Sequence, residues 1–259
     1  MRHETLCEPA LTTVVPMARL LFAIIAAAGI SSVLVATKAH ADTPRRPASD
    51  RDLRFWLDNM LVRHRYTNDE AAVAIGMTAE EVAAAAKRLE IGRQAQRERR
   101  ADAPLLVLPY PGGRHPRIGF LDGAVDPQRE TKVSIFAPWA DGGYAVADIP
   151  EAIWNQPEAG RELLYLAHTH VPTMWTKRGA TLEPLEWNKT DDGWQVERKL
   201  PNAVVFGTRV TPARDHVRME MWLTNGTDRA LRGLVVQNCV MLKGLAGFEQ
   251  QTNDNKLFR

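Results

Sequence analysis

Cysteine is scarce in this sequence, because the 259 residues contain only Cys7 and Cys239. A signal cleavage motif lies between them, so the processed chain would keep one cysteine and form no intrachain disulfide. No Cys-x-x-Cys pair occurs, which excludes a disulfide framework and the usual cysteine-based zinc sites. We interpret Cys239, inside the apolar run 234–242, as a small buried hydrophobic residue rather than a nucleophile.

Net charge and enzyme signatures are lacking as well. The chain has 33 Lys and Arg against 31 Asp and Glu, a formal +2, which is far from the basic footprint of a nucleic-acid-binding protein. It has no Gly-x-Ser-x-Gly elbow, no phosphate-binding loop and no Gly-x-Gly-x-x-Gly motif, which argues against serine acylation, nucleotide hydrolysis and hydride transfer. With 45% apolar and 25% charged residues, the composition is that of a globular protein, and we expect no cofactor.

Residues 1–41 read as an export signal. Residues 20–37 form an uncharged apolar run that ends near Ala39-His40-Ala41, a small-x-small cleavage site ahead of Asp42. Met17 opens a normal signal peptide and is a candidate true start. The alternative is an uncleaved membrane anchor, since eighteen apolar residues is about the lower limit for a span. Export to the periplasm or cell envelope is the prediction.

Residues 42–103 are predicted to be a linker followed by a tri-helical module. Apolar residues at positions 53, 56, 57, 60 and 61 follow helical spacing. Thr67 with Glu70, and Thr78 with Glu81, have capping-box spacing and predict helices that start near residues 68 and 79. Gly76 suits the turn between them. The pattern resembles a helix-turn-helix unit.

The last predicted helix is poorly suited to DNA. Its outward positions carry three acidic residues and two basic ones, and an exported protein meets no promoter. We therefore expect no specific nucleic-acid binding by residues 43–103, and consider a packing or docking role more favoured. A membrane-tethered helix-turn-helix regulator is kept as an alternative function.

From residue 104 to 259, apolar residues recur at every second position in short runs, which is typical of β-strands. This pattern predicts an antiparallel β-sandwich and, with the helices before it, an α+β protein. Parity along 217–223 places Met219 on the buried face, so Met219→Asp is expected to unfold the domain. Asn225-Gly226 marks a turn, and the run 234–242 is typical of a strand buried on both sides. The last residues look like the middle of a domain, so we expect a truncated C-terminus.

Several stretches carry a resemblance to known proteins. Together they resemble an uncharacterised family of exported bacterial β-sandwich proteins, over about residues 105–258, and the stretches are Leu108–His115, Asp126–Lys132, Tyr165–Pro172, Leu185–Asn188 and Val236–Lys243. The predicted strand at 217–223, the turn at Asn225-Gly226 and the returning strand at 234–242 also resemble the galactose-mutarotase-like supersandwich, whose concave face binds sugars. That second likeness concerns architecture, which does not by itself carry function.

His168 and His170 are the clearest chemical candidates. Two positions apart on a strand end, their imidazoles can point to one face and serve as an acid/base pair or as two metal ligands. A metal would need a third ligand, such as His115, Glu183 or Glu186. A mutarotase-like mechanism would pair a histidine with Glu186 or Glu220. The catalytic candidates are His168, His170 and Glu186, and a metal-dependent enzyme using the histidine pair is the alternative.

Aromatic and polar residues suited to a sugar accumulate in the same part of the sequence. Tryptophan faces can stack on sugar rings, and charged or amide side chains match hydroxyl groups. The candidate ligand-binding residues are Arg114, His115, Arg117, Trp175, Trp187, Asn188, Glu220 and Trp222. The predicted function is recognition of a carbohydrate or another polyhydroxylated ligand by an exported protein, with catalysis left open.

Overall fold

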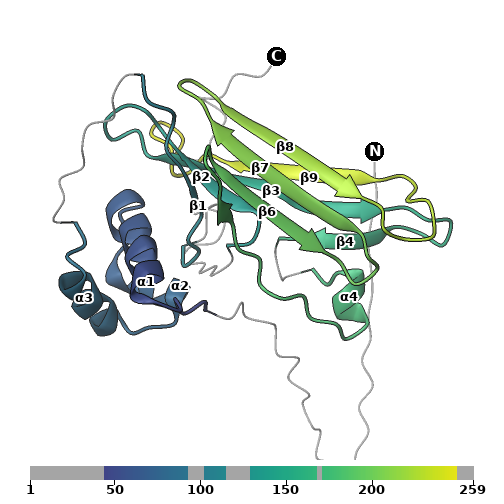
Figure 1. Ribbon diagram of the computed structural model, residues 1–259, viewed down its shortest axis with the longest axis horizontal. Helices are drawn as coiled ribbons and strands as arrows, with labels where there is room; N and C mark the ends of the chain where they lie inside the picture. The colour runs from purple at the N-terminus through teal and green to yellow at the C-terminus, as the bar shows by residue number, and fades with distance from the viewer. Residues whose placement is uncertain (1–43, 93–101, 115–128, 168–170, 250–259) are drawn as a thin grey trace, which may run out of the picture. The chain divides into compact units, whose positions relative to one another are not determined.

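The computed structural model describes residues 44–92, 102–114, 129–167 and 171–249. Over these residues, helices come first in the chain and antiparallel strands follow, arranged as two sheets in a sandwich-like manner (Figure 1). The predicted α+β class with a β-sandwich is therefore confirmed.

Local sequence signals set the helix bounds. The helices are α1 (Asp50–Leu57), which continues as the π-helix η1 (Asp58–Arg63), α2 (Asn68–Ile75) and α3 (Ala79–Arg88). Thr67 and Thr78 each accept a hydrogen bond from the amide three residues on, and Glu70 and Glu81 accept in return from the threonine amides. Gly76 ends α2 with φ +65°, the left-handed region that favours glycine. Both predicted capping boxes are confirmed, whereas the π-helical turn was not expected.

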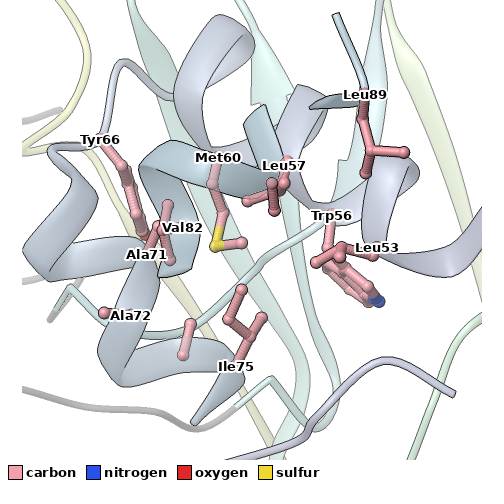
Figure 2. Packing of buried hydrophobic residues seen from close by; sticks show 12 residues of the cluster. Leu53, Trp56, Leu57, Met60, Tyr66, Ala71, Ala72, Ile75, Val82 and Leu89 are labelled. Atoms are coloured by element: carbon pink, nitrogen blue, oxygen red, sulfur yellow. The ribbon is translucent and has the colours of Figure 1, made fainter. Parts of the chain in front are cut away.

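The helices share an apolar core, drawn in Figure 2. Leu57 and Met60 project from the first helical stretch and are fully buried, as are Ile75 of α2 and Val82 of α3. The apolar stripe expected from the spacing is therefore the face on which these helices pack.

The larger sheet is organised around one long strand. Its strands are β1 (Val107–Pro109), β2 (Lys132–Phe136), β3 (Tyr144–Asn155), β4 (Glu162–Leu166) and β9 (Val235–Met241). β2 pairs with the first half of β3 and β4 with the second half, while β9 pairs with both halves. Since a strand has two edges, β2 and β4 must share one edge of β3 and meet near residues 149–151. We call this point the β2–β4 junction.

The smaller sheet packs on the larger one. Its strands, in order, are β5 (Asn188–Lys189), β6 (Trp194–Lys199), β7 (Val205–Pro212) and β8 (Val217–Thr224), and the short helix α4 (Met174–Lys177) precedes them. Val196 and Val210 of this sheet share an apolar cluster with Val133 and Ala147 of the larger sheet. Burial of these inward-facing side chains stabilises the sandwich.

Two expectations about burial are wrong. Met219 does lie on the inner side of its strand, opposite the buried Val210, yet it is 37% exposed, because β8 is an edge strand whose inner side is left uncovered. Met219→Asp is therefore no longer expected to unfold the domain, because the new carboxylate would not be buried. Residues 234–242 are not buried on both sides either, since β9 pairs only with β3 among the described residues and Val240 is 63% exposed.

Candidate functional site

The β2–β4 junction places charged side chains inside the protein. Lys132 and Asp148 are both fully buried, and the Lys132 ammonium lies 3.4 Å from a carboxylate oxygen of Asp148. Lys132 also donates to the carbonyl oxygen of Ala167, at 3.0 Å, just past the end of β4. Burying a charge costs several kcal/mol per ion unless the charge is paired and hydrogen-bonded. Lys132 and Asp148 meet this requirement, so their burial is a specific feature of the fold.

Thr131 and Tyr165 extend this polar centre. The Thr131 hydroxyl lies 2.7 Å from Oδ1 of Asp148 and 3.1 Å from the Tyr165 hydroxyl. The Tyr165 hydroxyl in turn lies 3.5 Å from a carboxylate oxygen of Glu130. Burial is the main cause that raises the pKa of Tyr165 well above its usual value, with the nearby carboxylates adding to it. Tyr165 is therefore a neutral hydroxyl that contacts Glu130 directly and is connected to Asp148 through the Thr131 hydroxyl.

Glu130 is contacted by cationic side chains from distant parts of the chain. Arg45 donates to Oε1 of Glu130 at 2.5 Å, and Arg198 of β6 donates to Oε2 at 3.1 Å. The backbone amide of Leu185 lies 3.4 Å from Oε1. These contacts bring three segments far apart in the sequence onto one partly buried carboxylate.

Glu186 is the exposed end of the same arrangement. Arg45 and Arg129 both donate to Oε1 of Glu186, at 2.9 and 3.3 Å, and the Glu186 side chain is 47% exposed. Its other oxygen, Oε2, accepts no hydrogen bond from the described residues. We call the whole set the charged network, and its members are Arg45, Arg129, Glu130, Thr131, Lys132, Asp148, Tyr165, Glu186 and Arg198.

Arg45 and Arg129, which hold Glu186, stay charged at neutral pH. Burial lowers the pKa of Arg45, but the attraction of Glu130 and Glu186 outweighs it and the net shift is upward. Burial lowers the pKa of Arg129 to about 10, partly offset by Glu186. Arg129 also packs its guanidinium 3.8 Å from the ring centre of Trp56 in α1. Glu186 is thus held by two fixed cations.

The sequence-predicted residues are placed as follows. Glu186 joins the charged network, and Asn188, two positions on, is exposed like it, whereas the alternating residues Leu185 and Trp187 are buried. Trp175 is buried and its indole donates to the Leu164 carbonyl. The rings of Trp175 and Trp187 are thus core rings, 4% and 8% exposed.

Other predicted residues lie elsewhere. Arg114 binds Glu70 of α2 through both Nε and Nη2, at 2.7 Å each. Glu220 and Trp222 share the outer face of β8, as parity predicted, where Glu220 accepts from Arg218 and Trp222 donates to Glu197. His115, Arg117, His168 and His170 lie outside the described residues.

Most of the network was missed by sequence reasoning. Arg129 to Lys132 form a charged run that leads into an apolar strand, a signal that could have suggested buried charge. Three of the stretches quoted above for the family resemblance contribute to the network: 126–132 supplies four side chains, and 165–172 and 185–188 supply one each. Arg45 and Arg198 carry no local signal, because only the fold brings them to Glu130.

The described residues contain no group of three or more His, Cys, Asp and Glu side chains placed to hold a metal. Nor does any helix in the described ranges have the length and apolar character needed to cross a membrane. Comparison of the chain with protein families, with curated proteins and with solved structures finds no match. The family resemblance and the predicted export stay predictions.

Proposed function

We propose that the protein binds a carbohydrate or another polyhydroxylated ligand at the exposed end of the charged network. The observation that carries the proposal is the state of Glu186, whose carboxylate is fixed by two guanidinium groups through Oε1 while Oε2 accepts nothing from the described residues. A fixed carboxylate oxygen is a strong acceptor for sugar hydroxyls, and its orientation costs no entropy on binding.

Asn188 also supports ligand binding at this place. It is exposed two positions from Glu186, on the outward side of an extended segment that Leu185 and Trp187 anchor in the core. An amide offers both a donor and an acceptor, which matches a hydroxyl group in either role. Together the two side chains form a polar edge on a rigid support.

The buried part of the network serves as the support. Arg45 and Arg129 are themselves held, Arg45 by Glu130 and Arg129 by the Pro111 carbonyl at 3.1 Å. Binding groups that are positioned by a surrounding shell keep their geometry better than free surface side chains. We assign no reaction to the site, and the proposal is one of recognition.

The test is a glycan array followed by titration of the best ligand. Glu186→Gln keeps the side-chain shape but removes the charge, and it should weaken binding by roughly ten- to a hundredfold, as expected for losing a charged partner of a hydroxyl. Asn188→Ala, at a side chain with no hydrogen bond to the described residues of the network, should weaken binding about tenfold. Glu158→Gln is the matched control at an exposed carboxylate that forms no hydrogen bond or ion pair with the described residues, and it should bind like the wild type.

Absence of any glycan bound above background by the wild type would overturn the proposal. So would equal affinity in all four proteins. The two alternatives from the sequence, a metal-dependent enzyme and a membrane-tethered regulator, depend on residues outside the described part of the chain, His168 with His170 in one case and 20–37 in the other.

A further inference from the structure

Strand β8 forms an open edge of the smaller sheet. It pairs with β7 along its whole length, from Val217 opposite Pro212 to Thr224 opposite Val205, without a register shift. On its other side β8 pairs with no strand of the described residues. A long regular edge of this kind exposes unpaired backbone groups and readily adds another strand.

The side chains of β8 do not protect this edge. Its inner row is apolar, with Met219 37% and Met221 43% exposed. The strand contains no proline and no lysine, and its inner row holds no charge, although these are the usual devices that block edge pairing. Met221 also borders a cavity of about 180 Å³ that reaches Val236 of β9, so the apolar surface continues between the two sheets.

The outer row of β8 carries opposite charges two positions apart. Arg218 and Glu220 lie 2.7 Å from one another within one chain. When two copies of β8 pair antiparallel about a two-fold axis, facing residues lie on the same face, so the axis must pass through one residue position. If that residue is Met219, Arg218 of each copy faces Glu220 of the other.

Neighbouring registers are less favourable. An axis through Arg218 places two arginines opposite one another, and an axis through Glu220 places two glutamates opposite one another, which is destabilising. The Met219 register also places Val217 opposite Met221, so the exposed inner row of each strand gains an apolar neighbour. Apolar pairing of the inner rows occurs in all three registers, so it is the charge pairing that favours the axis through Met219 over the other two.

From this charge pattern we propose that the protein forms a two-fold dimer in which β8 pairs with β8 of a second copy, centred on Met219, to give one continuous sheet. The pairing is isologous, so each favourable contact occurs twice. The dimer contact does not involve the charged network, and the dimer proposal is independent of the proposed ligand.

A charge-swap series on the full chain tests the dimer by sedimentation over a wide concentration range. The wild type should reach twice the mass of one chain. Arg218→Glu alone and Glu220→Arg alone each create two like-charge pairs and should raise the dimer Kd at least about tenfold. The double variant R218E/E220R restores both opposite-charge pairs and should dimerise like the wild type, which also shows that the substitutions do not prevent folding.

Arg178→Glu is the matched control, because Arg178 forms an exposed pair with Glu162 away from β8, at 4.0 Å, and it should leave the dimer intact. Slower hydrogen exchange of the 217–224 amides at high protein concentration is the second expected result. A wild type that stays monomeric throughout would overturn the proposal. Dimers that survive both single substitutions, or a double variant that folds but stays monomeric, would overturn it as well.

Discussion

His64 shows at the scale of a single residue how this fold uses a titratable group as a structural one. The ring is 2% exposed, with Nδ1 2.9 Å from the Asn59 carbonyl and Nε2 2.7 Å from the Ser134 hydroxyl. Tyr66, Tyr110, Phe136 and Tyr144 surround it edge-on. A neutral imidazole satisfies both contacts by donating through one nitrogen and accepting through the other.

The burial of His64 predicts a pH dependence of stability. Burial lowers its pKa from 6.5 to about 3, opposed by the hydrogen bond to Asn59 and aided by the Arg114 charge. The stabilisation is fully present above pH 6.5, and it is lost as the pH falls towards 3, because the unfolded chain then binds one more proton. In that window stability should fall by ~1.4 kcal/mol per pH unit from this group.

Urea unfolding between neutral pH and about pH 5 measures this effect. His64→Gln removes the titrating ring. The slope of the unfolding free energy against pH should therefore become shallower by ~1.4 kcal/mol per pH unit, the contribution of one proton, whatever the variant's absolute stability. Identical slopes in the wild type and the variant would show that His64 is not the group that titrates.

At the scale of elements, the sequence predicts much of the fold because helix caps and strand alternation are local. The threonine and glutamate spacings placed the starts of α2 and α3, and the apolar patterns at 217–223 and 234–242 placed strands close to β8 and β9. Burial of the edge strands was not predictable in the same way. Parity gives the face on which Met219 lies, but only the arrangement of the sheets decides whether that face is covered.

The cap of α3 gives an element-scale prediction. Thr78→Ala removes the hydroxyl that accepts the Glu81 amide, at 3.1 Å, and should lower the free energy of unfolding by about 1 kcal/mol. Thr78→Ser keeps the acceptor and should stay close to the wild type. Thermal or urea unfolding of the three proteins compares them directly. Equal stability of the alanine and serine variants would mean that the cap contributes nothing measurable.

At the scale of the whole molecule, long-range polar contacts tie the helices to the larger sheet. The described residues, from 44 onward, cluster as one compact unit. Arg114, just after β1, binds Glu70 of α2, lies 4.2 Å from the Tyr66 ring centre and donates to the His64 carbonyl. Asn59 donates to the Pro109 carbonyl at 2.9 Å. None of these pairs has a local sequence signal, since each spans more than forty residues.

These contacts predict that helices and sheets unfold together. Arg114→Ala leaves a half-buried Glu70 and the carbonyls of His64 and Arg65 without their partner, and it should cost roughly 2–4 kcal/mol. Arg65→Ala is the matched control, because Arg65 pairs with Asp141 on the surface, where both side chains are at least 70% exposed, and it should cost about 0–1 kcal/mol. Calorimetry should show one transition in each protein. Two separate transitions, or equal losses in both variants, would contradict the account.

The candidate site shows the same division between local and long-range information. Glu186 was predicted as a catalytic candidate and Asn188 as a ligand-binding residue, whereas the network behind them was not predicted. Arg45 lies 85 residues from Glu130 and 141 from Glu186, so only the folded chain reveals that Glu186 is a fixed carboxylate.

A crystal structure of the protein with the glycan selected on the array tests the central claim most directly. The account predicts a sugar hydroxyl within hydrogen-bond distance of Oε2 of Glu186, with Asn188 in contact with the same ligand and Arg45 and Arg129 still on Oε1. A glycan bound elsewhere, with Glu186 in contact only with its two arginines, would contradict it.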